Sequence, residues 1–230
     1  MKEELQSIQK PRHKEAGLKL FLNLKYKKYF RKTSLKQKNI GDLFLNIIQK
    51  KNPKTFLEIG IFHGVTARNV CELMFKNHGN NFNYIGIDIF DNSNAYDKEV
   101  VPSKTFNNPF KTFYFRYIKK QNPYSLIAVE DLLSKFKKNI KIIQGDTNQI
   151  LHDVDLKNVD FIFIDGGHDY KTVKNDLEQS FKIINKNGTI LCDDWNLSQA
   201  LGVREAIKDF SKEQNVNFEI VHERFAQFNL

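Results

Sequence analysis

The chain alternates between short apolar runs and stretches in which apolar residues recur every three or four positions. The apolar runs predict strands, and the amphipathic stretches predict helices. The expected strands cover residues 55–60, 82–90, 139–146, 159–165, 188–194, 216–223 and 225–230. The expected helices between them cover residues 65–77, 171–184 and 202–214. This alternation predicts an α/β fold, a mostly parallel sheet with helices on both faces and an antiparallel pair of strands at its C-terminal end.

N-terminal to the alternating strands and helices, the pattern predicts two further helices. Residues 18–30 place leucine and aromatic residues at helical spacing with lysines between them, which predicts a basic amphipathic helix. Such a helix either packs on the main domain or contacts a membrane surface or an anionic partner. A second helix is expected from Ile40 to Lys50, ended by Asn52-Pro53. We therefore divide the chain into a basic helical N-terminal extension, residues 1–52, and a main domain, residues 53–230.

Residues 91–135 interrupt the alternation with a long insertion. The segment holds three prolines and a dense group of aromatic and basic residues from Phe106 to Tyr117. It forms either a lid or wall for a substrate at the carboxyl edge of the sheet, or a satellite helix with a small hydrophobic cluster of its own.

Charge and composition narrow the class of protein. Residues 1–54 hold 15 Lys and Arg against 4 Asp and Glu, a net of +11, whereas residues 55–230 hold 21 against 23, a net of −2. The basicity thus belongs to the N-terminal part, which argues against a main domain that grips nucleic acid along a whole face. Neither a membrane-spanning run nor a signal peptide is apparent, and Cys71 and Cys192 lie in apolar contexts. We expect a cytoplasmic protein with reduced cysteines.

Polar residues follow the first three strands of the main domain. "LEIGIFHGVT" supplies Glu58, Gly60, Gly64 and Thr66, where the glycines permit a tight turn and the next helix offers backbone N–H groups to an anion. Asp88 ends the second strand, where a carboxylate can accept both hydroxyls of a ribose. Asp146 and Thr147 follow the third strand, where an adenine amino group can be recognised. Each residue alone is as well explained as a helix cap or turn residue.

In these motifs the chain resembles the class I S-adenosylmethionine-dependent methyltransferases, over about residues 53–230. The resemblance implies a Rossmann-like seven-stranded sheet. It also implies S-adenosylmethionine as cofactor, bound by Glu58, Gly60, Gly64, Thr66, Asp88, Asp146 and Thr147, with Asp165 also near the cofactor.

The fourth and fifth strands end in carboxylates, in "FIDGGHDY" and "ILCDDW". Asp165, Asp193 and Asp194 should meet at one rim, where a hard divalent cation would relieve their repulsion. The chain here resembles the metal-dependent O-methyltransferases of the catechol and macrolide-sugar types, which implies Mg²⁺ or another divalent cation on these residues. The alternative is that Asp193 and Asp194 cap the next segment and Asp165 contacts the cofactor.

His168 lies three residues after Asp165, where the catechol type has a lysine as general base. Imidazole suits a base near neutral pH, although a lone loop histidine is often structural. The "D-G-x-H-x-Y" pattern brings the chain closer to a broad bacterial group and leaves catechol in doubt as the acceptor. Trp195 either lines the acceptor site or caps the fifth strand. "NNPF" and "QNPY" resemble an amino-methylating motif in the wrong places and are given no catalytic role.

These observations predict a metal-assisted O-methyltransferase acting on a small molecule or glycan, with Asp165 and His168 in the catalytic step. One alternative is an RNA methyltransferase that uses the basic N-terminal segment. Another is a module that binds the cofactor without chemistry. A homodimer is compatible with each of them.

Overall fold

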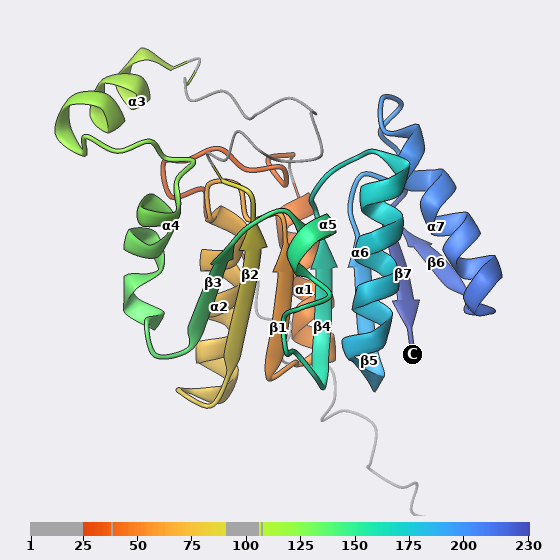
Figure 1. The fold of residues 1–230 in the computed structure, drawn as a ribbon. Helices are drawn as coiled ribbons and strands as arrows, with labels where there is room; N and C mark the ends of the chain where they lie inside the picture. Colours follow the sequence, from red (N-terminus) through yellow and green to blue (C-terminus); the bar gives the residue numbers. More distant parts are fainter. Residues whose placement is uncertain (1–24, 38, 91–105, 107) are drawn as a thin grey trace, which may run out of the picture.

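The computed structural model describes residues 25–37, 39–90, 106 and 108–230. At its centre lies a seven-stranded sheet in the order β3-β2-β1-β4-β5-β7-β6 (Figure 1). The strands are β1 (Thr55–Ile59), β2 (Asn83–Asp88), β3 (Ile140–Gln144), β4 (Val159–Ile164), β5 (Ile184–Cys192), β6 (Phe218–Val221) and β7 (Phe225–Asn229). Only β7 runs antiparallel to its neighbours, β5 and β6. The predicted mostly parallel sheet with an antiparallel C-terminal pair is therefore confirmed.

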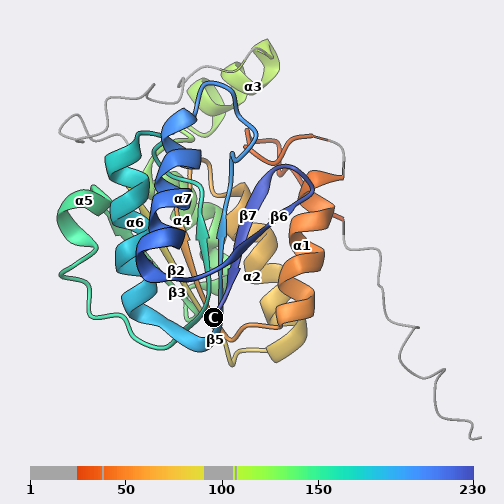
Figure 2. The same cartoon turned by 90° about the vertical axis from the view of Figure 1, so that its right-hand side faces the viewer.

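Helices cover both faces of the sheet, as the alternation predicts (Figure 2). The helices are α1 (Ile40–Lys51), α2 (Val65–His78), α3 (Pro109–Phe113), α4 (Leu126–Leu133), α5 (Thr147–Ile150), α6 (Tyr170–Ile183) and α7 (Leu201–Gln214). A π-helical turn, Tyr114–Ile118, continues α3, and a 3-10 turn, Ser134–Phe136, follows α4. In Figure 2, α1 and α2 lie on one face of the sheet and α5, α6 and α7 on the other.

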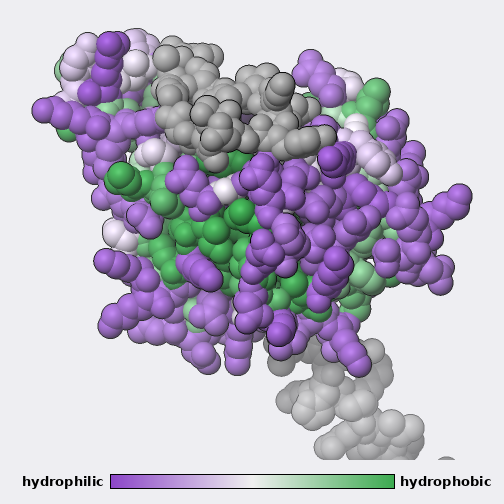
Figure 3. All heavy atoms as spheres, in the orientation of Figure 1, coloured by the Kyte–Doolittle hydropathy of each residue, from purple (hydrophilic) through white to green (hydrophobic). Residues whose placement is uncertain are grey.

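The two cores follow from the two-residue period of the strands. Phe56 and its same-face neighbours pack with α1, α2 and α4, and Phe56 stacks on Phe161 with ring centroids 5.1 Å apart. Leu57 points the other way and joins the aliphatic cluster beneath α6 and α7. Figure 3 shows apolar side chains visible on the face of the sheet in front of β2 and β3, to one side of the short α5. Cys71 and Cys192 are buried free thiols, one in each core.

The prediction of a helix before α1 is wrong for the part of it that the structure describes. Residues 18–24 lie outside the described residues, residues 25–28 have no regular secondary structure, and residues 29–30 form a turn. The N–H of Tyr26 donates to Asp42 Oδ1 at 2.7 Å, and that of Lys27 donates to Asn69 Oδ1 at 2.9 Å. These hydrogen bonds to side chains of α1 and α2 take the place of the backbone hydrogen bonds of a helix. The segment therefore lies against both helices without being helical itself.

The topological switch point of the sheet, where the order of strand addition reverses, lies at β1. The chain moves from β1 outward through β2 to β3 and then returns to form β4 on the other side of β1. In open α/β sheets, such a switch leaves a crevice beyond the carboxyl ends of the strands, and ligands bind there.

Candidate functional site

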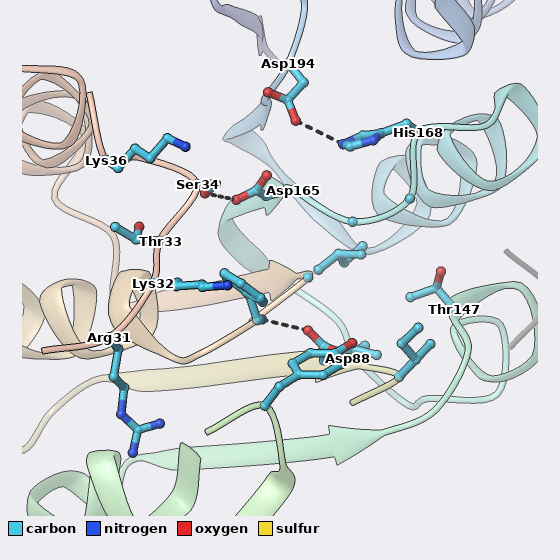
Figure 4. A pocket seen from close by; sticks show the side chains of 18 of the residues that line it. Arg31, Lys32, Thr33, Ser34, Lys36, Asp88, Thr147, Asp165, His168 and Asp194 are labelled. Atoms are coloured by element: carbon cyan, nitrogen blue, oxygen red, sulfur yellow. Dashed lines mark hydrogen bonds and ion pairs between the residues drawn. The ribbon is translucent and has the colours of Figure 1, made fainter. Parts of the chain in front are cut away.

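A cavity of about 800 Å³ lies at this crevice. Its volume falls in the range of roughly 300–1,000 Å³ that is usual for small-molecule and cofactor sites. Figure 4 shows side chains from β2, β4, β5 and the segment before α1 turned toward it. The sequence-predicted residues on its wall are Gly60, Asp88, Asp146, Thr147, Asp165, His168 and Asp194. The structure thus brings together residues from five different loops.

Gly60 ends β1 at the closest approach between β1 and β4. Its φ is +88°, and a Cβ atom added there would overlap the carbonyl oxygen of Asp165. Only glycine combines this conformation with this approach. The backbone at Gly60 and Asp165 therefore forms a part of the cavity wall, which we call the floor.

Asp88 is fixed at the end of β2 by four hydrogen bonds. Its Oδ2 accepts from the N–H groups of Ile61 at 2.6 Å and Phe62 at 2.8 Å, and its Oδ1 accepts from Phe90 N–H and from the hydroxyl of Tyr124 at 2.9 Å. Burial raises the pKa of this carboxyl, and these donors partly counter the rise. Tyr124, from the insertion, was not foreseen as part of this end of the site.

Asp146 and Thr147 lie at the end of β3, where α5 begins. Asp146 is the N-cap of that helix, and its side chain accepts from Asn148 N–H at 2.9 Å. Both residues also line the cavity. The capping role and the predicted place beside a ligand therefore coexist.

Three other predicted cofactor residues are not on the cavity wall. Glu58 points into the aromatic core, where the hydroxyl of Tyr84 donates to it and burial raises its pKa to about 8. Thr66 contacts the hydroxyl of Tyr26 at 2.7 Å, and Gly64 faces Val129 of α4. The structure gives these residues a role in packing beneath the site.

Asp165, Asp193 and Asp194 converge as the two strand ends predict. Each offers one carboxylate oxygen within 4.8 Å of the others, which is a spacing that a single metal ion can bridge. The pKa of Asp165 is raised well above its ordinary value by burial and by the two neighbouring carboxylates. Asp194 adopts a φ of +61°, in the left-handed region that L-residues other than Asn and Asp seldom occupy.

Arg224, in the turn before β7, partly balances this charge. Its guanidinium donates to both oxygens of Asp193 at 2.6 Å each and lies 3.6 Å from Asp194. Sequence reasoning missed this residue because it lies 31 positions from Asp193 in the sequence. One guanidinium against three carboxylates leaves the rim acidic.

His168 lies beside the acidic rim, across the cavity from residues 28–36. Its Nε2 lies 3.0 Å from Asp194 Oδ2, and its side chain is one-third exposed, at 33%. If Nε2 carries the proton, Asp194 orients the ring and Nδ1 is the basic nitrogen. The structure therefore places His168 where the sequence predicts it, beside the acidic cluster.

The segment from Lys28 to Lys36, which we call the strap, forms a wall of the cavity that the sequence did not predict. It contributes lining residues Lys28, Arg31, Lys32, Thr33, Ser34 and Lys36. Ser34 donates from Oγ to Asp165 Oδ2 at 2.6 Å (Figure 4). No local pattern signals this contact, because the two residues are 131 positions apart.

Trp195 takes a structural position, whereas each of the two Asn-Pro motifs contributes a residue to the cavity wall. Trp195 packs against Phe218 of β6 with ring centroids 5.4 Å apart and does not line the cavity. Asn108 caps α3, with its side chain accepting from two N–H groups of that helix. Of the insertion, residues 91–105 and 107 lie outside the described residues, and Phe106, Asn108, Lys111 and Tyr124 line the cavity.

Among the described residues, none of the helices has the length and apolar character that a membrane crossing needs.

The sheet order, the crevice and the strand-end residues together define a Rossmann-like methyltransferase. Residues 57–195 match the family model described as "Methyltransferase domain", and the chain belongs to this family. Its fold is similar to that of the O-methyltransferase NovP, with 12% identity, a TM-score of 0.62 and coverage of 83% of this chain and 80% of that one.

Two further solved structures share the fold. CalS11, a TDP-rhamnose 3'-O-methyltransferase of calicheamicin biosynthesis, is 14% identical with a TM-score of 0.56, over 85% of this chain and 81% of that chain. A methyltransferase of Podospora anserina bound to S-adenosylhomocysteine is 18% identical with a TM-score of 0.51, over 82% and 76%. No curated protein sequence matches the chain.

Proposed function

We propose that the protein transfers a methyl group from S-adenosylmethionine to a hydroxyl oxygen of a small molecule or glycan, assisted by a divalent cation. One observation carries the proposal. A single cavity runs from Gly60, Asp88 and Thr147, where the cofactor is expected, to Asp165, His168 and Asp194. A methyl donor at the first end and a hydroxyl at the second would meet inside one enclosure, and such positioning supplies much of the rate of group transfer.

The residues at the two ends divide the work of binding. Asp88 would accept a ribose hydroxyl in place of the hydroxyl of Tyr124, with its carboxylate already held by backbone N–H groups. Thr147 and Asp146 would contact the adenine end. The methionine part would lie against the backbone at Gly60, where the lack of a side chain lets the loop after β4 pack closely against the end of β1.

The carboxylate cluster fits a hard divalent cation. Three ionised carboxylates and one guanidinium carry a formal charge of −2, which such an ion balances. Asp193 keeps acceptor capacity beside Arg224, because each carboxylate oxygen has two lone pairs. Oxygen ligands are the ones that Mg²⁺ prefers, and a bound cation lowers the pKa of a coordinated hydroxyl.

His168 would remove the proton of the acceptor hydroxyl. Asp194 holds the ring at 3.0 Å and would stabilise the imidazolium that forms. Ser34 fixes one oxygen of Asp165 and keeps that carboxylate turned toward the rim.

The test is methyl transfer from radiolabelled S-adenosylmethionine to a panel of catechols, free sugars and sugar phosphates, with Mg²⁺ or with EDTA. The proposal predicts a methyl ether product that forms with Mg²⁺ and not with EDTA. Full activity in the chelator would refute the assistance by metal, and methylation of nitrogen would refute the acceptor class. Calorimetry with S-adenosylhomocysteine, which needs no acceptor, tests the cofactor separately.

A further inference from the structure

Lysines line the part of the cavity that the strap and α3 form. The strap contributes Lys28, Lys32 and Lys36, and α3 of the insertion contributes Lys111. In Figure 4 the side chains of Lys32 and Lys36 extend from the strap, on the other side of the pocket from His168. The cavity therefore carries basic residues on the strap and α3 and acidic residues at the ends of β4 and β5.

Two of these lysines, from distant parts of the chain, converge on one aromatic ring. The Nζ atoms of Lys32 and Lys111 lie 5.6 Å and 5.7 Å from the ring centroid of Phe106, and Lys111 Nζ is also 4.9 Å from that of Phe30. Both lysines are partly buried. The two ammonium groups therefore lie near the same ring on the cavity wall.

The strap holds its lysines on a fixed wall. The buried guanidinium of Arg31 donates to the carbonyls of His63 at 3.2 Å, Pro123 at 3.3 Å and Ala128 at 2.8 Å. These bonds tie the strap to the loop after β1 and to the insertion. A wall arranged in advance loses little conformational entropy on binding, which favours recognition of a ligand.

The pKa of His63, which contacts the strap, shows that the electrostatic potential near the strap is positive. Burial and then the nearby charges of Arg31, Lys32 and Lys111 lower its pKa to about 3. The imidazole therefore stays neutral at physiological pH.

The cofactor is not the kind of ligand that a group of lysines attracts. S-adenosylmethionine carries one carboxylate against an ammonium and a sulfonium, so its own net charge is positive. We propose that the methyl acceptor bears a phosphate or diphosphate group, which binds to Lys32, Lys36 and Lys111 while its hydroxyl lies at the acidic rim. This inference rests on the proposed function and names the acceptor class of the same site. Lysines are common phosphate ligands, acting as point charges.

The enclosure favours a small phosphorylated acceptor over RNA. The lysines line a cavity that also contains the acidic rim, whereas proteins that bind single-stranded nucleic acid offer an open basic groove that follows the backbone. A phosphate at the strap would place the rest of a small acceptor across the cavity, toward Asp165 and His168.

The test is calorimetric titration of pyrophosphate and of glucose 1-phosphate into the protein saturated with S-adenosylhomocysteine, in buffer with EDTA so that no metal binds the probe. The wild type should bind at least one of the two. The Lys32→Gln/Lys36→Gln variant and the separate Lys111→Gln variant should bind it at least about tenfold more weakly, since each loses a charged partner of the anion. The matched control is Lys137→Gln/Lys138→Gln, two exposed lysines just before β3 that do not line the cavity. Thermal unfolding of each variant shows that it is folded.

The outcomes separate the two proposals. If the wild type binds S-adenosylhomocysteine but neither phosphate probe, or if the strap and control variants bind a probe equally, the inference is overturned and the proposed function stands. If the wild type does not bind S-adenosylhomocysteine, both fail. If a single-stranded RNA oligonucleotide displaces pyrophosphate, with affinity that falls steeply with salt, the small phosphorylated acceptor is overturned in favour of RNA.

Discussion

Replacing Arg224 by methionine is the perturbation that most directly tests the charge balance of the rim. The side chains of Arg224 and Asp193 are 9% and 1% exposed and are joined by two hydrogen bonds of 2.6 Å. Methionine keeps much of the length of the side chain and removes the charge. Asp193 then stays buried, without its guanidinium partner, beside Asp165 and Asp194.

The expected cost is large because the pair is shielded from water. Breaking a buried pair by removing one partner destabilises a protein by about 3–5 kcal/mol. For a domain of this size, each kcal/mol lowers the melting temperature by about 2–4 °C, so Arg224→Met should melt about 6–20 °C lower in EDTA. Circular dichroism at pH 7 measures both the melting temperature and, with urea, the free energy of unfolding.

A second variant isolates the cause of the loss. Arg224→Met/Asp193→Asn removes the stranded charge as well, and it should recover most of the lost stability. Mg²⁺ should raise the melting temperature of Arg224→Met more than that of the double variant, because only the single variant keeps all three proposed ligands. The reasoning is wrong if Arg224→Met melts like the wild type, or if the double variant is no more stable than the single one.

The remaining predictions concern Glu58 in the core, Gly60 in the floor of the cavity and His168 as the general base. Between its ordinary pKa of 4.5 and about 8, Glu58 keeps a proton in the folded state that the unfolded chain releases. Its contribution to stability is therefore present at low pH and lost as pH rises through this window, by up to about 1.4 kcal/mol per pH unit. Glu58→Gln should flatten that loss in urea unfolding between pH 5 and pH 8, and an unchanged slope would contradict the assignment. Gly60→Ala should weaken binding of S-adenosylhomocysteine at least about tenfold, because its Cβ would displace the backbone at residue 165. Gly79→Ala, also at positive φ but with open space around the added atom, should bind normally, and equal calorimetric affinities of the two variants would refute the role of the floor. His168→Ala should lower kcat about 10²–10⁴-fold with unchanged affinity for S-adenosylhomocysteine, and a wild-type rate would remove it from the mechanism.

The sheet could be predicted from the sequence because its central strands β1, β2 and β4 are buried on both faces. Runs such as "FIFI" at residues 161–164 are apolar throughout, and the polar residue that follows marks the carboxyl edge. The same pattern predicts that Asp88, Asp146, Asp165 and Asp194 share that edge, and all four line the cavity. The pattern of apolar residues in a strand extends over only a few positions, so a short stretch of sequence is enough to predict the strand.

The parts that sequence reasoning missed depend on contacts between distant segments. Tyr26 and Lys27 have helical periodicity, but hydrogen bonds to Asp42 and Asn69 hold them outside any helix. The strap then reaches the cavity, where Ser34 meets Asp165. Glu58 fits a cofactor motif by position, yet the two-residue period of β1 turns its side chain into the aromatic core. The contacts of Tyr26, Lys27 and Ser34 have no local signal, whereas the period of β1 could have shown the orientation of Glu58.

The measurement that tests the central claim most directly is methyl transfer from S-adenosylmethionine to the acceptor panel by one enzyme preparation, first treated with EDTA and then supplied with Mg²⁺. The account predicts that a hydroxyl is methylated, that EDTA abolishes the reaction, and that Mg²⁺ restores it in the wild type but not in Asp165→Asn. Methylation at full rate in EDTA, or restoration by Mg²⁺ in Asp165→Asn equal to that of the wild type, would contradict it.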